Sequence, residues 1–127
     1  MRLAHVWFGP NFHLFRHSHP LGDCTYYVAA GELTMGKRSL KAGSTIFVPN
    51  EMPYKFVAGP DGVEVLEFRS GGSVPGKPKM KIEETSLASI QKIIDDYKAN
   101  QHLWKIPPNF SDTGHVKPHE GSKQLAP

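Results

Sequence analysis

Hydrophobic and polar residues alternate in short runs over the first half of the chain. Between positions 12 and 19, His13, Phe15, His17 and His19 share one parity, and the residues between them share the other. Alternation of this kind places successive side chains on opposite faces of a strand. Similar short runs, rich in apolar or β-branched residues, fall at 3–8, 24–29, 33–35, 38–40, 45–48, 54–57 and 63–68. Many short strands at regular spacing predict a β-sandwich or a barrel.

Glycine and proline separate these runs and predict the turns between them. The Gly-Lys pair at 36–37 lies between two short runs, which is typical of a hairpin. The Gly-Pro-Asp-Gly sequence at 59–62 is a strong turn signal, and Gly-Glu at 31–32 predicts a second tight connection. We therefore expect the chain to reverse direction at each of these places.

The period of the pattern changes after the barrel strands. Residues 71–81 form a linker rich in Gly, Pro and Lys. Beyond it, apolar residues recur at helical spacing, at Leu87, Ile90, Ile94 and Tyr97. We expect a helix over 82–100, capped by Thr85 or Ser86, whose apolar face covers the barrel or a partner chain. The polar segment 101–127 is expected to be an extended or disordered tail.

Composition narrows the class of protein. The 127 residues, 39% of them hydrophobic, suffice for one domain with its own core, which we expect over 1–70. A net charge of +3 on scattered lysines is typical of a solvated surface, and it does not indicate nucleic-acid binding. The single cysteine, Cys24, excludes a disulfide within the chain and predicts the reducing cytoplasm. The first apolar run is too short and too interrupted for a signal peptide or a membrane span.

The pair His17 and His19 is the sharpest chemical feature of the sequence. Residues i and i+2 of a strand share a face, so the two imidazoles are able to converge on one ion. Neutral imidazole suits Fe, Zn and Ni. The alternative is that the two histidines are partly buried and hydrogen-bonded within a sheet. The residues around the pair help to choose between these two interpretations.

The run from Asn11 to Gly31 resembles the first motif of the cupin superfamily, written G(x)5HxH(x)3–4E(x)6G. His17 and His19 match its histidines, Gly31 matches its final glycine, and Asn11 stands at its first glycine, where asparagine also tolerates a left-handed backbone. The resemblance implies an all-β double-stranded β-helix, a jelly-roll barrel. With the segments beyond the barrel, the expected architecture is this barrel, a C-terminal helix and an extended tail.

A second run, at 43–58, looks like the second cupin motif, G(x)5PxG(x)2H(x)3N. Gly43 and Pro49 match at the right spacing, and Tyr54 stands where that motif has its histidine. In the family, the two histidines and the glutamate of the first motif bind a metal together with the histidine of the second. By this resemblance, His17 and His19 carry over as metal ligands.

The remaining ligand positions depart from the family pattern. Counting from His19, either Asp23 or Cys24 falls at the glutamate position. Asp23 supplies a hard oxygen ligand or is simply a turn residue, and Cys24 is a thiolate ligand or a small core residue. Glu67 has the parity of an inward-facing carboxylate, although exposure at a strand edge is the simpler account. Tyr54 is a proton donor opposite the histidines or a tyrosine packed at the rim.

Three functions follow from this resemblance. The first is a metal-dependent enzyme, with Fe, Zn, Ni or Mn held by His17 and His19 and completed by Asp23 or Glu67, acting on a small organic substrate by dioxygenase-like or Lewis-acid chemistry. The second is a metal-free isomerase or epimerase that uses histidine with Tyr54 as acid and base. The third is a non-catalytic module that binds a small ligand. We also expect a homodimer, with no nucleic-acid or membrane partner.

Overall fold

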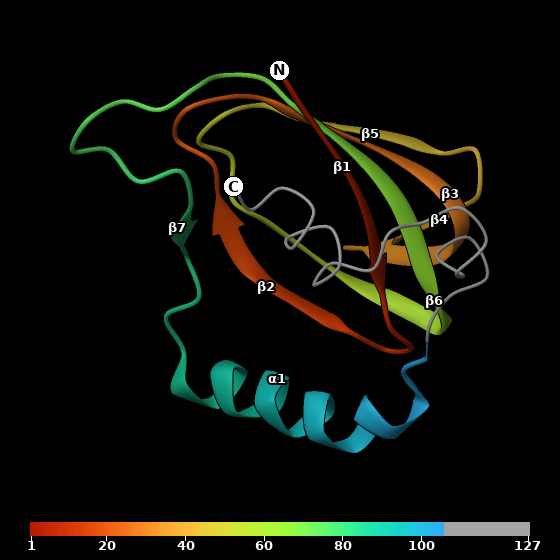
Figure 1. Cartoon of the computed structure of the whole chain (residues 1–127). Helices are drawn as coiled ribbons and strands as arrows, with labels where there is room; N and C mark the ends of the chain where they lie inside the picture. The colour runs from red at the N-terminus through yellow and green to blue at the C-terminus, as the bar shows by residue number, and fades with distance from the viewer. Residues whose placement is uncertain (106–127) are drawn as a thin grey trace, which may run out of the picture.

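The computed structural model describes residues 1–105, which form a small β-barrel with one long helix against its outside (Figure 1). The helix α1 spans Leu87–Asn100, and the short 3-10 helix η1 follows at Gln101–Leu103. The strands, in chain order, are β1 (Arg2–Phe8), β2 (His13–Ser18), β3 (Cys24–Met35), β4 (Arg38–Lys41), β5 (Thr45–Val48), β6 (Tyr54–Arg69) and β7 (Lys81–Ile82). The prediction of an all-β barrel followed by a helix is confirmed.

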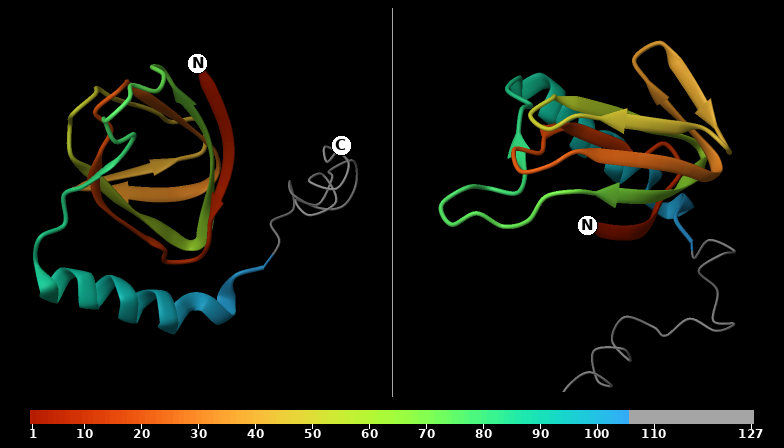
Figure 2. Two further views of the ribbon diagram at one scale, coloured as in Figure 1. Left: turned by 60° about the vertical axis from the view of Figure 1, so that its left-hand side comes forward. Right: turned by 90° about the horizontal axis from the view of Figure 1, so that it is seen from above.

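Two long strands, β3 and β6, run through both sheets of the barrel. One sheet has the order β5-β3-β6-β1 and the other has the order β4-β3-β6-β2-β7, with every pair antiparallel. Figure 2 shows the two sheets curving around a common interior, with the helix lying beside one of them. This arrangement is a double-stranded β-helix.

The two long strands bend at glycines that the sequence pattern interprets as turns. Gly31 and Gly62 have positive φ angles of 74° and 82°, and a Cβ on Gly31 would lie 2.2 Å from the carbonyl oxygen of Gly62. The pairing of β3 with β6 also shifts register on both sides of Gly31. Glycine tolerates such backbone at a bulge, so each strand crosses from one sheet to the other without reversing. The expected turns at 31–32 and 59–62 are therefore corners within β3 and β6.

Alternate side chains of β3 and β6 fill the interior. The buried apolar residues share one parity along each half-strand, and they are Cys24, Tyr26, Val28, Leu33, Val48, Tyr54, Phe56, Ala58, Val63 and Val65. At one end of the barrel the ring of Phe8 packs on Phe12 and on Phe56, with centroid separations of 5.3 and 5.2 Å. We call this end, where the three aromatic rings pack together, the phenylalanine end.

The helix begins later than the sequence pattern predicts. Lys81–Ile82 pairs with the end of β2 as the short strand β7, so the expected helix over 82–100 is found at Leu87–Asn100. Ser86 is the N-cap, as expected, and its side chain accepts a hydrogen bond from the N–H of Ser89 at 3.3 Å. Of the expected linker over 71–81, residues 71–80 connect β6 to β7 without helix or strand, and Lys81 begins β7.

Aromatic rings pack the C-terminal end of the helix against the barrel. The indole of Trp104 contacts the ring of Phe12 at 5.6 Å and that of Tyr97 at 4.9 Å between centroids. Residues 101–103 are helical where a tail is expected, and the prediction for 106–127 lies outside the described residues. Neither helix in the described range has the length and apolar character needed to cross a membrane.

Candidate functional site

Polar side chains gather inside the barrel at the end opposite the phenylalanine end. Strand register brings them together, because His17 pairs with Tyr54 across β2 and β6, and Tyr26 pairs with Glu67 across β3 and β6. Both ends of β6 contribute, since the strand passes through both sheets. The interior polar cluster, as we name it, consists of His17, His19, Tyr26, Tyr54, Glu67 and Arg69.

Two unusual backbone positions precede the strands that carry this cluster. Asn11 has a φ of 58° and Glu51 a φ of 63°, and no other non-glycine residue among 1–105 has a positive φ. Both stand where the two cupin motifs have glycine, the residue that this left-handed backbone favours. The N–H of Glu51 donates to the carbonyl of His19 at 3.0 Å, which ties the loop before Tyr54 to the histidine strand. The backbone thus supports the register in which the two motifs align.

Both histidines of the cluster are almost fully buried, with exposed fractions of 3% for His17 and 4% for His19. Nδ1 of His17 lies 2.8 Å from the carbonyl oxygen of Phe15, and Nδ1 of His19 lies 3.3 Å from that of Lys79. A carbonyl oxygen only accepts, so each Nδ1 carries the proton and donates it. In the neutral ring, the lone pair then lies on Nε2.

A chain of hydrogen bonds joins two tyrosines to His19. The hydroxyl of Tyr54 lies 3.1 Å from Nε2 of His19 and 2.5 Å from the hydroxyl of Tyr26. Because this Nε2 is an acceptor, Tyr54 donates to it, and Tyr26 in turn donates to the oxygen of Tyr54. All three side chains are buried, and in such a setting successive hydrogen bonds polarise one another. We call this arrangement the Tyr–Tyr–His chain.

Burial sets the protonation state of the cluster. It lowers the pKa of His17 and of His19 below the ordinary value of 6.5, and the guanidinium of Arg69 lowers both further. Burial also raises the pKa of Tyr26 and of Tyr54 far above the ordinary value of 10.0. At neutral pH the site therefore presents two uncharged imidazoles beside two protonated phenols.

The charged members of the cluster neutralise each other. Glu67 faces the interior, with 12% of its side chain exposed, and one of its oxygens forms an ion pair with the terminal nitrogen Nη2 of Arg69. The thiol of Cys24 lies beside them, and burial, reinforced by the charge of Glu67, raises its pKa. Cys24 is therefore a protonated core thiol at neutral pH, in keeping with the simpler of its two interpretations.

The cluster offers a metal ion two imidazole nitrogens but few further ligands. Within residues 1–105, no group of three or more His, Cys, Asp and Glu side chains is arranged to hold a metal. Glu67 is occupied by Arg69, whose positive charge also opposes a cation beside His17 and His19. The residues present therefore do not fit a metal centre with a full set of protein ligands.

Asp23 lies apart from the other expected ligands. It is in the turn before β3, where its Oδ1 accepts from the N–H of Asn50 at 2.9 Å. Its backbone N–H donates to the hydroxyl of Ser70 at 2.9 Å, and its carbonyl accepts from the N–H of Ser70. The structure thus brings His17, His19 and Glu67 together, whereas Asp23 stabilises the connection between two loops.

A cavity of about 220 Å³ opens at this end of the barrel and reaches His19 and Arg69. Its wall includes a close contact between two loops, where a Cβ on Gly71 would lie 1.9 Å from the carbonyl oxygen of Leu21. We call it the mouth cavity, and it is lined by Met1, Arg2, His19, Leu21, Gly22, Arg69, Ser70, Gly71, Gly72, Ser73 and Lys79. It gives a small molecule access to the Tyr–Tyr–His chain at its histidine.

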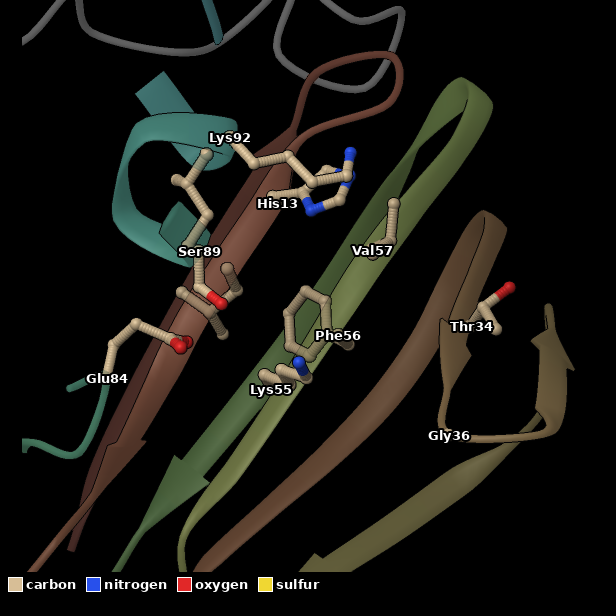
Figure 3. A pocket seen from close by; sticks show the side chains of 11 residues that line it. His13, Thr34, Gly36, Lys55, Phe56, Val57, Glu84, Ser89 and Lys92 are labelled. Atoms are coloured by element: carbon tan, nitrogen blue, oxygen red, sulfur yellow. The ribbon is translucent and has the colours of Figure 1, made fainter. Parts of the chain in front are cut away.

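A different cavity, of about 270 Å³, lies outside the barrel between α1 and the strands β2 and β6 (Figure 3). His13, Lys55 and Lys92 lie around it, with Glu84 and Ser89 on the helix side. Its lining includes Phe56 of the core and Leu14, which packs against the core, but no member of the interior polar cluster. Because it lacks the buried acid–base groups, we place the candidate site at the mouth cavity.

Sequence reasoning missed two members of the cluster. The sequence patterns single out neither Tyr26 nor Arg69 as a site residue. Parity along the strands would have found both, since Tyr26 follows the inward Cys24 by two residues and Arg69 follows the inward Glu67 by two. The hydroxyl contact between Tyr26 and Tyr54 depends on pairing across the barrel, which no local pattern shows.

Comparison by sequence finds no matching family model and no matching curated protein. Comparison by structure finds several barrels. The chain is similar to the polyketide cyclase RemF from Streptomyces resistomycificus, with 21% identity, a TM-score of 0.55, and 77% of this chain and 71% of that chain covered. It is also similar to an uncharacterised protein with a double-stranded β-helix domain from Klebsiella pneumoniae, with 21% identity, a TM-score of 0.52, and coverage of 65% and 74%.

A third similar structure is a DMSP lyase, at 22% identity and a TM-score of 0.52. The match covers 65% of this chain, which spans only 44% of the lyase chain. At these identities the likeness concerns the fold alone. The chain therefore has a double-stranded β-helix fold, the architecture that the two sequence motifs predict.

Proposed function

We propose that the chain is a small-molecule enzyme that uses His19 and Tyr54 for acid–base chemistry inside the barrel. The observation that carries this proposal is the buried Tyr–Tyr–His chain, which meets the mouth cavity at His19. Proteins of this fold include a cyclase and a lyase, but a fold does not dictate a reaction. The proposal therefore rests on the geometry of these side chains.

The chemistry begins with an exchange of hydrogen bonds. In the free protein the hydroxyl of Tyr54 donates to Nε2 of His19. Tyr54 does not line the mouth cavity itself, so a substrate would reach past His19 to place a carbonyl oxygen at the Tyr54 hydroxyl. That oxygen would accept the hydrogen bond of Tyr54 in place of Nε2, which frees the lone pair of Nε2. The imidazole then takes a proton from the carbon next to the carbonyl, while Tyr54 donates its hydrogen bond to the developing enolate oxygen.

The protonation states support this division of roles. The lowered pKa of His19 keeps the imidazole neutral and able to accept a proton near pH 7. The raised pKa of Tyr54 keeps its hydroxyl protonated, so it stabilises the enolate as a hydrogen-bond donor. Tyr26 donates to the oxygen of Tyr54 and strengthens that donor. Return of the proton to the other face, or to another carbon, completes an isomerisation or epimerisation without any redox change.

Deuterium exchange tests the proposal whatever the product of the reaction is. The purified protein is incubated in D2O with a panel of 2-oxo acids, 2-hydroxy acids and sugars, and loss of the C–H signal is followed by NMR. We expect exchange with at least one of these compounds. His19→Gln should slow it by about 100-fold or more. Tyr54→Phe should slow it by about 100-fold, because the donor to the enolate is lost.

His13→Gln is the matched control, because His13 lies on β2 like His17 but its Nε2 contacts a carboxylate oxygen of Asp96 of the helix, at 3.1 Å. This variant should exchange at the wild-type rate. Exchange that survives both His19→Gln and Tyr54→Phe would contradict the acid–base roles. Ligand binding with no exchange by any variant would favour the non-catalytic binding module instead.

The metal-dependent enzyme stays a prediction, with one observation in its favour. Both Nδ1 atoms of His17 and His19 contact backbone carbonyls, the usual support of metal-binding histidines. Each Nε2 lone pair is then directed away from that carbonyl, although Nε2 of His19 accepts from Tyr54 in this structure and would have to exchange that hydrogen bond for the metal. When bound, a divalent metal would supply Lewis-acid or oxygen chemistry. Against it stand the missing third ligand and the charge of Arg69.

Metal analysis decides between the two functions. One equivalent of Fe, Zn, Ni or Mn in the purified protein, lost in a His17→Ala/His19→Ala variant, would establish the metal-dependent enzyme. Absence of bound metal after reconstitution with each ion, together with exchange by the metal-free protein, would leave acid–base chemistry. The measurement can be made before any substrate is identified.

A further inference from the structure

The lining of the mouth cavity carries positive charge on three sides. Arg2 comes from the start of β1, Arg69 from the end of β6, and Lys79 from the segment before β7. The lining residues include no aspartate or glutamate. Of the three cations, only Arg69 has a carboxylate partner that the structure records, which is Glu67. The cavity therefore has an excess of positive charge toward its opening.

Arg69 is the cation placed deepest in this wall. Three quarters of its side chain is buried, and its charge acts on His17 and His19. Glu67 engages its terminal nitrogen Nη2, while the buried Nε has no hydrogen-bond partner among the described residues. A guanidinium has five N–H donors, so this one retains donors that Glu67 does not use. Arginine is the side chain that best matches the two oxygens of a carboxylate.

The size of the cavity limits what it holds. Its volume of about 220 Å³ lies below the range of roughly 300–1,000 Å³ that is common for ligand pockets. The close contact of the loops at Gly22 and Gly71 fixes one side of the wall. A molecule of a few carbon atoms fits such a space. Arg69 and His19 both line this cavity, so a molecule held by Arg69 shares the cavity with the imidazole of His19.

We propose that the mouth cavity binds a small organic acid, whose carboxylate is held by Arg69 and flanked by Lys79 and Arg2. This inference rests on the proposed function and names its substrate class: a short-chain oxo acid, whose carboxylate is held by Arg69 while the oxygen of its separate carbonyl group accepts from Tyr54. His19 then removes a proton from the carbon next to that carbonyl group. Lys79 contributes to the cavity wall in two ways: its backbone carbonyl accepts a hydrogen bond from His19, and its charged side chain is exposed.

Matched acids and amides test this inference by binding alone. Propionate and lactate are titrated into the ¹³C,¹⁵N-labelled full-length protein at fixed pH and ionic strength, and the imidazole signals of His19 are followed by NMR. Propionamide and lactamide have the same shape without the charge. We expect the acids to bind with a Kd in the millimolar range and the amides to bind at least about tenfold more weakly.

Variants of the lining locate the anion. Lys79→Gln should raise the Kd of the acids by about 3- to 10-fold, because an exposed charge contributes less than a buried one. Its control is Lys77→Gln, on the same segment but outside the lining, which should bind as the wild type does. Glu67→Gln/Arg69→Gln removes both members of the ion pair, so no buried charge is left unpaired, and it should abolish measurable binding.

Several results would overturn the inference. Equal affinity for acid and amide would remove the role of charge. Equal weakening by Lys77→Gln and Lys79→Gln would indicate general attraction by the surface. Binding of inorganic phosphate without binding of either acid would assign a different anion. Absence of binding by either acid would remove the site.

The outcome remains separable from that of the proposed function. Tyr54→Phe should bind propionate as the wild type does while losing deuterium exchange. Carboxylate binding without exchange would keep the site and remove the acid–base enzyme. Exchange on uncharged sugars without carboxylate binding would keep the enzyme and remove this substrate class.

Discussion

Folding buries His17 and His19, and the Nδ1–H of each ring donates a hydrogen bond to a backbone carbonyl. An imidazole in this position is held as a neutral group, because a second proton would have to be carried in a buried site beside Arg69. The same feature that makes His19 a base at neutral pH makes the fold sensitive to acid.

The free energy of unfolding should therefore fall as the pH drops below about 6.5. The folded pKa of both histidines is lowered, so in this range the unfolded chain binds protons that the folded chain does not. The loss should reach at most about 1.4 kcal/mol per pH unit for each histidine. Urea titrations between pH 5 and 7.5 measure it, in a window above the usual carboxylate range.

Variants assign this slope to its source. His19→Gln should remove up to one proton from the pH dependence, whatever its effect on stability at pH 7.5. His102→Gln, at an exposed position in η1, is the control for the substitution itself. A slope that is the same in His19→Gln and the wild type would show that His19 is not held neutral by the fold.

At the residue scale, the sequence predicted which residue types occupy the candidate site better than it predicted which side chains touch each other. Spacing identified His17, His19 and Tyr54, because the cupin motifs encode positions along strands. It could not decide between Asp23 and Cys24, since one residue of register moves a side chain from the interior to the loop. In the structure Cys24 is buried in the interior, and Oδ1 of Asp23 accepts a hydrogen bond from the N–H of Asn50 in the loop.

At the level of elements, the least secure part of the molecule is the attachment of α1. None of its residues is fully buried. Its contacts with the barrel include Asp96 with His13 of β2, and the ring of Trp104, which follows the helix, with Phe12. The indole lies over Gly9, where a Cβ would come within 2.2 Å of the ring, and its Nε1 donates to the carbonyl of Pro10 at 3.4 Å. The absence of a side chain at residue 9 is therefore what lets the helix end settle on the barrel.

Gly9→Ala should detach this end of the helix while the barrel stays folded. The added methyl group overlaps the ring of Trp104, and the backbone at Gly9 has no positive φ that would strain alanine by itself. We expect a loss of about 1–3 kcal/mol in unfolding free energy. Amide hydrogen exchange of the helix should accelerate, with the barrel strands still protected.

A double-mutant cycle distinguishes this overlap from a general effect of the substitution. Trp104→Ala removes the ring, so Gly9→Ala should cost little in that background, and the two changes should couple strongly. Leu103→Ala, at an exposed position beside Trp104, serves as the control. Additive effects of Gly9→Ala and Trp104→Ala would show that the ring does not occupy the space above Gly9.

The helical period and the Ser86 cap were predictable, since both are local. The corners of β3 and β6 were not. A glycine at a bulge and a glycine in a turn look alike in sequence, and only the pairing of Gly31 with Val63 tells them apart. The sequence analysis also missed the short strand β7, because its two residues form a strand only by pairing with the end of β2.

At the level of the whole molecule, the sheet formed by β5, β3, β6 and β1 has an apolar outer face. Its register places Leu3 beside Phe68, Phe68 beside Thr25, and Thr25 beside Phe47. Leu3 and Phe47 are 59% and 63% exposed, and Tyr27 lies in the next row. A row of this kind on one sheet is self-complementary about a two-fold axis, so it suits an interface between two copies of the chain.

We expect a homodimer through this face, so that light scattering after gel filtration gives twice the chain mass of 14.1 kDa. Phe47→Glu places a charge in the middle of the apolar row and should give a monomer with the barrel intact by circular dichroism. Leu87→Glu is the matched control, since Leu87 is 83% exposed at the start of α1, away from this sheet. A wild-type monomer at micromolar concentration would exclude the dimer, and dissociation by Leu87→Glu alone would move the interface to the helix.

Because Arg2 and Arg69 begin and end the paired strands of this same sheet, a dimer that forms here would also fix the wall of the mouth cavity.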